Sequence, residues 1–288
     1  MIVVTGATGQ LGRLIVEQLL ARLPSSRVGV SVRDPGKAAD LGARGVRVRH
    51  GDFSNAASLQ SAFEGATQVL LVSSNARATG GDTLAQHRTA IAAARAAGAE
   101  RVVYTSHMGV SDRSAFAPMH DHHATEAMLQ ESGMSWVALR NGFYAASSLA
   151  LLGNAVQTGT LEAPADGKVS WTAHADLAEA AALLLTQAGG EDGPTAPLTA
   201  SCALDLSDIA ALLAELTGRP VQRRVVEDEV LAAQLAARGL PARAAATVLG
   251  LYRASREGEF AAVDPTLGRL LGRAPTSLRA LLEAKLAR

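Results

Sequence analysis

The stretch VTGATGQLGR, residues 4–13, places three glycines, Gly6, Gly9 and Gly12, at intervals of three. A β-branched run at residues 2–5 precedes them and predicts a strand, and apolar residues at helical spacing over residues 11–20 predict a helix after them. A glycine-rich turn in this place exposes backbone N–H groups at a helix N-terminus, where they and the helix dipole suit a pyrophosphate. We therefore predict a dinucleotide-binding turn.

Each glycine has its own task in this prediction. Gly6 permits the tight turn, Gly9 lets a phosphate approach the backbone, and Gly12 allows close contact between helix and strand. The spacing departs from the common G-x-G-x-x-G fingerprint, so the alternative is that the glycines serve only a turn, and the flanking strand and helix favour the dinucleotide. The residues assigned to the phosphate contact are Gly6, Thr8, Gly9, Gln10, Leu11 and Gly12.

Alternation of strands and helices continues through the first half of the chain. Further strands are predicted at residues 27–32, 45–49, 68–72, 101–105 and 135–139, with helices at residues 82–97 and 120–131 among those between them. After about residue 153 helices dominate, at residues 176–187, 207–216, 227–238 and 277–286. We expect an α/β fold with a Rossmann-type doubly wound parallel sheet that binds NAD(P) at residues 1–153. A smaller, mostly helical lobe at residues 154–288 is expected to cover the substrate, and we leave open that some of its segments return to the sheet.

Composition narrows the class of protein. Lys+Arg and Asp+Glu both number 27, so nothing argues for a nucleic acid or an anionic membrane as partner. The single cysteine, Cys202, fits a reducing compartment, and glycines interrupt the apolar N-terminus, unlike a signal peptide. No apolar run is long enough to span a bilayer. We expect a soluble, cytoplasmic protein and leave its oligomeric state open, with a homodimer as one option.

The end of the second predicted strand bears on which dinucleotide is bound. A cationic side chain there accommodates the 2′-phosphate of NADP, whereas an acidic one binds the ribose hydroxyls of NAD. Arg33 comes first after the strand, and its planar guanidinium suits a phosphate, while Asp34 before Pro35 is expected to cap the next turn. We predict NADP(H) in preference to NAD(H); the alternative has Arg33 solvated and Asp34 on the ribose.

Two further strand ends complete the expected cofactor contact. Asp52 and Phe53 follow the third strand and are expected at the adenine edge. Ser73 and Ser74 follow the fourth strand and are expected beside the ribose and nicotinamide. The carboxyl ends of parallel strands lie along one edge of a sheet, which is where such folds bind ligands.

Motifs along nearly the whole chain resemble one family. They are VTGATGQLG at the start, the Arg-x-Pro-x-Lys-Ala pattern at residues 33–38, GDF at residues 51–53, LLVSS, VVYTS, HHATEAML, LRNGFY and, near the C-terminus, LGRAPTSLRALL. The chain resembles the NmrA-like atypical short-chain dehydrogenases/reductases, and among these the NAD(P)H:quinone oxidoreductases of type 2 and the triphenylmethane reductases. The resemblance implies a Rossmann lobe, bound NADP(H), Thr105 and Ser106 at the cofactor, and two-electron reduction of a quinone-like acceptor.

The chain lacks the proton relay of ordinary short-chain dehydrogenases. That relay is a tyrosine four residues before a lysine, whose ammonium group lowers the pKa of the phenol. The three tyrosines of this sequence, at positions 104, 144 and 252, are not followed by a lysine at that distance. The resemblance puts Pro118 in the place of the relay tyrosine and His122 in the place of the lysine, and proline has no proton to donate.

This absence selects among electron acceptors. Hydride added to a simple ketone leaves an alkoxide whose conjugate acid has a pKa near ~16, so that reaction needs a positioned acid. Hydride added to a quinone leaves a phenolate-like anion with a conjugate acid of pKa ~10, which takes its proton from water, and a cationic dye needs none. We predict NADPH-dependent reduction of quinones or related planar electron acceptors by direct hydride transfer. The alternatives are a non-catalytic, NADP(H)-binding redox sensor of NmrA type and an isomerase or dehydratase of a nucleotide-linked substrate.

Four residues are predicted at the reacting end of the site. His122 is expected to touch the nicotinamide ribose, and Asn141, Phe143 and Tyr144, just after the sixth strand, are expected to border the nicotinamide. The two aromatic rings either stack on a flat acceptor or pack the junction of the lobes. The histidines within residues 120–123 and Glu126 resemble a metal cluster, but adjacent side chains on a helix point apart, so we predict no metal.

Overall fold

The computed structural model describes residues 1–187 and 192–287. The chain forms two compact units, each assembled from separate segments. The Rossmann unit comprises residues 1–106, 121–140 and 174–196, and the second unit comprises residues 107–120, 141–173 and 197–288. This division differs from a single boundary after residue 153, because residues 174–187 and 192–196 belong to the Rossmann unit and residues 107–120 belong to the second unit. Residues 188–191 and 288, part of the expected lobe at 154–288, lie outside the described residues.

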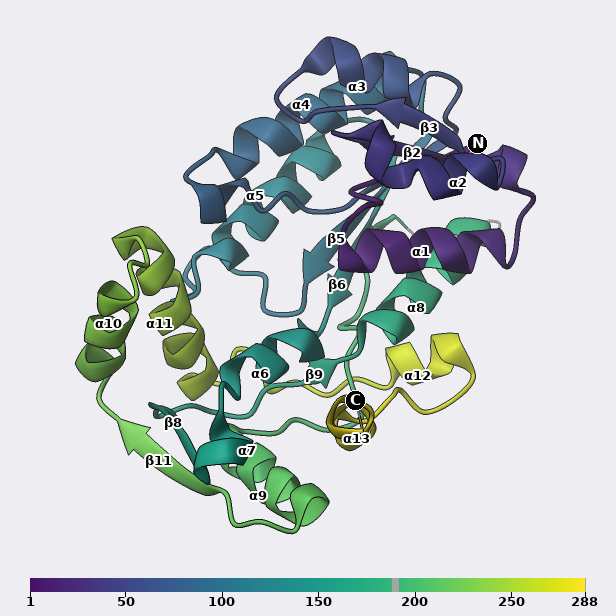
Figure 1. Cartoon of the computed structure of the whole chain (residues 1–288). Coiled ribbons are helices and arrows are strands. Elements are labelled where there is room, and N and C mark those ends of the chain that lie inside the picture. The colour runs from purple at the N-terminus through teal and green to yellow at the C-terminus, as the bar shows by residue number, and fades with distance from the viewer. Residues whose placement is uncertain (188–191, 288) are drawn as a thin grey trace. The chain divides into compact units, whose positions relative to one another are not determined.

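A parallel sheet forms the centre of the Rossmann unit (Figure 1). Its strands are β1 (Ile2–Thr5), β2 (Val28–Val32), β3 (Arg47–His50), β4 (Gln68–Leu71), β5 (Arg101–His107), β6 (Ser135–Asn141) and β10 (Gly193–Pro194). Across the described residues they follow the order β10-β6-β5-β4-β1-β2-β3. The order reverses between β1 and β4, the switch point at which such sheets bind ligands. The apolar runs of β1, β2 and β4 are almost entirely buried, as expected for strands covered on both faces.

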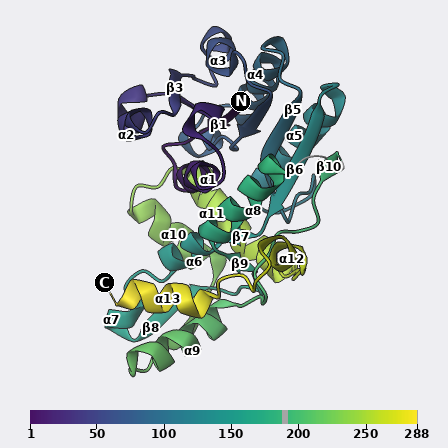
Figure 2. The same cartoon turned by 90° about the vertical axis from the view of Figure 1, so that its right-hand side faces the viewer.

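Helices cover both faces of this sheet (Figures 1 and 2). On one face α1 (Gln10–Leu20) packs against α8 (His174–Thr186). The other face carries α3 (Ala56–Phe63), α4 (Thr83–Ala96) and α5 (Pro118–Glu131), whose apolar side chains share a core cluster with β4 and β5. The short helix α2 (Ala39–Ala43) and the 3-10 turns η1 (Ser25–Arg27), η2 (Pro35–Ala38) and η3 (Ala76–Thr79) lie in the connections.

The second unit is mostly helical. Its helices are α6 (Ala145–Leu151), α7 (Ala155–Thr158), α9 (Leu206–Thr217), α10 (Asp228–Ala237), α11 (Ala242–Arg256), α12 (Thr266–Leu271) and α13 (Leu278–Leu286). Two short parallel pairs accompany them: β8 (Thr160–Pro164) with β11 (Gln222–Val226), and β7 (Phe143–Tyr144) with β9 (Trp171–Thr172). A separate hydrophobic core includes Phe143, Trp171, Tyr252 and Phe260.

The structure confirms the predicted fold class, a doubly wound parallel sheet flanked by helices. Predicted strands at residues 27–32 and 68–72 match β2 and β4 to within a residue. Helices α6, α7, α11 and α12 have no counterpart in the sequence prediction, and none of them begins with a side-chain cap. The helix predicted at residues 176–187 begins two residues earlier, at His174.

Candidate functional site

The glycine turn between β1 and α1 is tight for reasons of backbone geometry. Gly6 adopts a φ of +61°, a left-handed conformation that side chains rarely adopt. The Gly9 amide donates to the Gly6 carbonyl oxygen at 2.9 Å and closes the turn. A Cβ on Gly12 would lie 2.3 Å from that same carbonyl oxygen. The first turn of α1 therefore approaches the loop more closely than a residue with a side chain at position 12 would allow.

The start of α1 fits an anionic diphosphate. Gly9 is the N-cap residue and provides no side-chain acceptor for the first amides of the helix. The first turn of the helix carries no acidic residue. Of the predicted phosphate contacts, Gly6, Thr8, Gly9 and Gln10 are exposed, whereas Leu11 and Gly12 are buried. Uncapped backbone N–H groups and the positive end of the helix dipole therefore meet at the surface, which is the arrangement that binds phosphate.

Arg33 follows β2 and is exposed. No hydrogen bond or ion pair within the described part of the chain engages its guanidinium. The Asp34 carboxylate accepts a hydrogen bond from the Gly36 amide at 3.0 Å and caps the turn that starts at Pro35, which confirms the capping prediction. Because the turn uses this carboxylate, Arg33 is the charged side chain at the end of β2 that is free to meet a phosphate.

The residues after β3 form a short turn. Asp52 accepts a hydrogen bond from the Ser54 amide at 2.8 Å, and Phe53 lies half-buried against the core of the Rossmann unit. A side chain at Gly51 is excluded, because its Cβ would lie 2.0 Å from Ser31 Oγ. The backbone of this segment is therefore closely constrained. The contact of Asp52 and Phe53 with adenine stays a prediction.

The segment after β4 is held by side chains of other elements. The Ser73 amide donates to Thr105 Oγ1 at 2.9 Å, and the Ser74 amide donates to His87 Nε2 at 2.8 Å. The Ser74 hydroxyl donates to the Gln86 side chain. The Ser73 hydroxyl has no hydrogen-bond partner among the described residues. Of the two predicted serines, Ser73 therefore has the hydroxyl available to a ligand, and Thr105, also predicted at the cofactor, uses its oxygen to hold Ser73.

A buried carboxylate joins the ends of β5 and β6. Ser106 Oγ donates to Glu126 Oε1 at 2.6 Å. Arg140 donates to the same carboxylate through Nε, at 3.2 Å, and through Nη2, at 2.7 Å. Ser106 and Glu126 are buried, so the hydroxyl that we predicted at the cofactor is engaged inside the protein.

His122 pairs with a tyrosine from the sheet. Its Nδ1 lies 2.7 Å from the Tyr104 hydroxyl. Loss of hydration, aided by nearby His87 and opposed by Asp121, lowers the pKa of His122 to about 3, although part of the side chain remains accessible. His122 is therefore neutral near pH 7 and can give or accept a hydrogen bond without carrying a charge.

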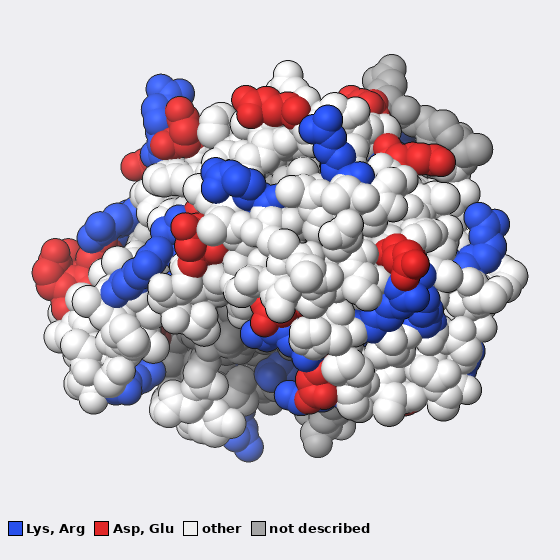
Figure 3. All heavy atoms as spheres, turned by 90° about the horizontal axis from the view of Figure 1, so that it is seen from above, with Lys and Arg blue, Asp and Glu red and all other residues white. Residues whose placement is uncertain are grey.

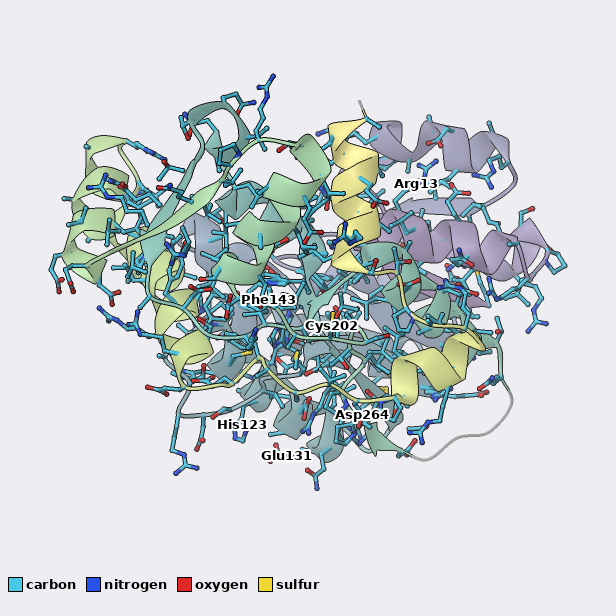
Figure 4. The ribbon with its side chains drawn as sticks, turned by 90° about the horizontal axis from the view of Figure 1, so that it is seen from below. Arg13, His123, Glu131, Phe143, Cys202 and Asp264 are labelled. Carbon is cyan, nitrogen blue, oxygen red and sulfur yellow. The ribbon has the colours of Figure 1, made fainter. Side chains whose placement is uncertain are left out.

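The neighbouring histidines do not converge. His120 Nε2 lies 2.8 Å from the carbonyl oxygen of Ser114, and His123 is exposed (Figure 4). Within the described residues, no group of three or more His, Cys, Asp or Glu side chains is placed to hold a metal ion. The divergence follows from the helical geometry of α5, on which adjacent side chains point in different directions.

In the second unit, Asn141 is almost fully buried. Its carbonyl oxygen accepts a hydrogen bond from the Met108 amide at 2.8 Å. Its side-chain Oδ1 has no hydrogen-bond partner among the described residues. A buried acceptor without a partner costs stability unless a ligand or water satisfies it, so this atom is suited to receive a hydrogen bond from a bound molecule.

Phe143 lies in an aromatic cluster of the second unit. It meets Trp171 and Phe260 edge-on, with ring centroids 5.4 and 5.1 Å apart, and it contacts His107 in the same way at 5.2 Å. The Phe116 ring lies 5.7 Å away in a tilted arrangement. Only 7% of Phe143 is exposed. Packing within the unit therefore occupies most of this ring, and Tyr144, which is half-buried, has more surface to offer a flat molecule.

The remaining tyrosines are poor proton donors. Burial raises the pKa of Tyr144, and the Asn141 side chain opposes that effect. Burial also raises the pKa of Tyr252 to about 12. A relay tyrosine needs the opposite change, a pKa lowered by a nearby cation.

Sequence reasoning missed two side chains that organise these elements, Glu126 and Arg140. Glu126 lies one helical turn after His122, a spacing noted only as a potential metal pair. His87 falls on an amphipathic helix and gives no signal in the sequence that its ring accepts a backbone hydrogen bond.

The fold and the uncapped glycine turn define a dinucleotide-binding protein of the Rossmann class. The chain belongs to the NAD(P)H-binding, NmrA-like family, and the family model matches residues 6–188. The family resemblance drawn from the sequence motifs is thereby confirmed.

Several named relatives cover almost the whole chain. Quinone oxidoreductase 2 of Escherichia coli is 36% identical over 279 residues, which are 96% of each protein. Its structure in complex with NADPH matches 100% of both chains with a TM-score of 0.92 at 35% identity. An NmrA-like family domain-containing oxidoreductase of Aspergillus flavus is 33% identical over 94% of this chain and 90% of the relative. The structure of the triphenylmethane reductase of a Citrobacter species, complexed with NADP(H), matches 100% of both chains with a TM-score of 0.89 at 31% identity.

Two features of the described residues concern possible partners. No helix among them has the length and apolar character needed to cross a membrane. On the face seen in Figure 3, acidic and basic side chains are interspersed. This face thus carries no large patch of one sign that would attract a polyanion.

Proposed function

We propose that this protein is an NADPH-dependent oxidoreductase that reduces quinones or related planar electron acceptors, dyes included, by direct hydride transfer. The names of its relatives support the proposal, since they include a quinone oxidoreductase and a triphenylmethane reductase. The observation on the chain itself that carries it is the lack of a tyrosine fitted to donate a proton. The family resemblance puts Pro118 in the relay position, and the pKa values of Tyr144 and Tyr252 are raised.

The missing proton donor matters more for some acceptors than for others. A ketone must receive a proton as it receives hydride, and loss of a positioned acid forfeits a factor of about 10² to 10⁴ in rate. A quinone holds the added charge on a phenolate-like oxygen, and water can supply the proton afterwards. The residues of this chain then need only bind and orient the acceptor and exclude water from the site, which they can do without an acid.

The Rossmann unit binds the cofactor in this proposal, and bound NADPH supplies the hydride. The glycine turn and the start of α1 bind the diphosphate, and Arg33 contacts the 2′-phosphate. Asp52 and Phe53 border the adenine. The Ser73 hydroxyl and His122 meet the nicotinamide ribose, each as a neutral hydrogen-bonding group.

The second unit contacts the acceptor in this proposal. Tyr144 offers its ring to a planar molecule, and Phe143 supports it from within the aromatic cluster. The unpartnered Oδ1 of Asn141 accepts a hydrogen bond from a donor group of a bound molecule. These residues bind and orient the acceptor without exchanging protons with it.

An acceptor panel tests the proposal. NADPH consumption is followed by absorbance with benzoquinones, naphthoquinones, triphenylmethane dyes and aliphatic ketones of similar size. We expect turnover with quinones or dyes and none above background with the ketones. Ketone reduction at a comparable rate would contradict the proposal. Tight NADP(H) binding with no consumption in the presence of any acceptor would identify the redox sensor instead.

We also infer a cytoplasmic setting for this reaction. Cys202 is the sole cysteine of the sequence and is exposed, which suits a compartment that keeps thiols reduced. Cell fractionation tests the location, and light scattering of the purified protein decides whether it is a monomer or a homodimer.

A further inference from the structure

Side chains from three separate elements hold the segment that follows β4. The donor–acceptor pairs are Val72 N to Thr5 Oγ1 at 2.9 Å, Ser73 N to Thr105 Oγ1 at 2.9 Å, and Ser74 N to His87 Nε2 at 2.8 Å. Because β1 and β5 are the neighbours of β4 in the sheet, Thr5 and Thr105 reach the segment from both sides. His87 reaches it from α4. All three acceptor residues are almost completely buried.

The hydrogen bonds around His87 define where its proton lies. The Ser74 amide can only donate, so Nε2 accepts and carries no proton. The Thr125 hydroxyl donates to the Asp121 carbonyl oxygen at 2.6 Å, so its oxygen accepts from His87 Nδ1 at 2.8 Å. The ring is therefore neutral, with its proton on Nδ1. Burial agrees with this state, because it lowers the pKa of His87 to about 4, and Asp121 only partly opposes that shift.

Packing keeps the His87 ring in this orientation. The ring meets Tyr104 edge-on, with centroids 5.4 Å apart. The preceding residue, Gln86, accepts a hydrogen bond from the Ser74 hydroxyl, so α4 holds both the backbone and the side chain of Ser74. Of the two serines, this leaves the Ser73 hydroxyl without a partner among the described residues.

We propose that His87 is a positioning residue for the cofactor: its Nε2 fixes the Ser74 backbone and thereby sets where the Ser73 hydroxyl meets the nicotinamide end of NADPH. This inference rests on the proposed function, because it takes the segment after β4 as part of the cofactor site. Without an acceptor at position 87 the Ser74 amide loses its partner, and the segment must be ordered again each time the cofactor binds. The free energy spent on ordering the segment lowers the affinity for the cofactor.

The first test needs neither cofactor nor variant. Nitrogen-15 NMR of the histidine side chains in the wild-type protein at pH 7 should report a neutral His87 with its proton on Nδ1. Hydrogen exchange should show protected amides at residues 72–74. A proton on Nε2, or a charged ring at this pH, would overturn the proposal outright.

The second test compares two substitutions at one position. His87→Phe keeps a ring but removes the acceptor, and we expect faster exchange at Ser74 and NADPH binding weakened about tenfold by titration. The KM for NADPH should rise in proportion, while kcat at saturating NADPH changes much less. His87→Gln returns an acceptor oxygen and should recover most of the affinity. Thr89→Ala, on the same helix, is the matched control and should leave all readouts unchanged.

The outcomes separate the inference from the proposed function. If the wild-type protein binds NADPH and His87→Phe binds it equally well, the positioning role is wrong and the proposed function stands. If the wild-type protein binds no NADPH, both fail, and amide exchange still reports whether the Ser74–His87 bond exists. Should His87→Phe fail to fold, Thr125→Val replaces it. That variant removes the acceptor of Nδ1 and is expected to weaken NADPH binding by about threefold, and unchanged affinity would overturn the proposal.

Discussion

The Tyr104 hydroxyl and His122 Nδ1 lie 2.7 Å apart, which places a tyrosine beside the residue that the family resemblance aligns with the relay lysine. The pair does not reproduce the relay. Tyr104 is fully buried on β5, and burial lowers the pKa of His122 to about 3, so His122 carries no charge that could activate the phenol near pH 7. The two side chains form a neutral hydrogen bond between the sheet and α5.

The first prediction concerns this pair. His122→Ala should weaken NADPH binding about fivefold, because a neutral hydrogen-bonding group at the nicotinamide ribose is lost. Tyr104→Phe should lower the free energy of unfolding by about 1 kcal/mol and reduce affinity less, because the ring contact remains. Cofactor titration and urea unfolding measure the two effects. His123→Ala, at an exposed position of the same helix, should change neither quantity. If His122→Ala and His123→Ala bind NADPH with the same affinity, His122 does not contact the cofactor.

The second prediction concerns the carboxylate of Glu126. Glu126→Ala leaves Ser106 and the guanidinium of Arg140 without their partner, and we expect it to lower the free energy of unfolding by about 2 kcal/mol. Glu126→Gln retains an acceptor for Ser106 and should cost about half as much. Glu131, which is exposed at the end of the same helix, provides the control (Figure 4). If Glu131→Ala lowers the free energy of unfolding as much as Glu126→Ala does, the hydrogen bonds of Glu126 to Ser106 and Arg140 do not stabilise the fold.

The third prediction concerns cofactor choice. Arg33→Ala should weaken NADPH binding about tenfold and leave NADH binding unchanged, because only NADPH carries the 2′-phosphate that a guanidinium can bind with charge-assisted hydrogen bonds. Parallel titrations with both cofactors measure the change. Arg88→Ala removes the same charge from an exposed position on α4 and should affect neither. An equal loss for NADPH and NADH in Arg33→Ala would contradict the phosphate contact.

The fourth prediction concerns acid stability. Burial lowers the pKa of His87 to about 4 from an ordinary value of 6.5, so between these values the unfolded chain binds a proton that the folded protein does not. Stability is fully present above pH 6.5 and declines as the pH falls towards 4, by about 3 kcal/mol from this residue. Urea unfolding at several pH values measures the slope. His87→Gln should reduce the slope and leave the part that comes from the lowered pKa of His122, and an unchanged slope in that variant would show that His87 does not contribute.

Much of the fold was open to prediction because its signals are local. A β-branched run of four residues makes β1, and the steric freedom of Gly6 makes the turn after it, whatever the rest of the chain does. The missing relay is also a local fact, since it depends only on which residue lies four positions after a tyrosine. The division into two units was different: residues 193–194 join the sheet through pairing with β6, which no local pattern encodes.

The sequence by itself determined the Rossmann class, the glycine turn, the family and the absence of a tyrosine–lysine pair, because each depends on neighbours along the chain. Only the tertiary structure decided that His87 holds Ser74, that Glu126 joins Ser106 to Arg140, and that Phe143 is packed among other rings. The physical reason is that a side chain's hydrogen-bond partner is set by which distant segments meet in space. A histidine on a helix looks the same in the sequence whether it faces solvent or accepts the amide of a strand end.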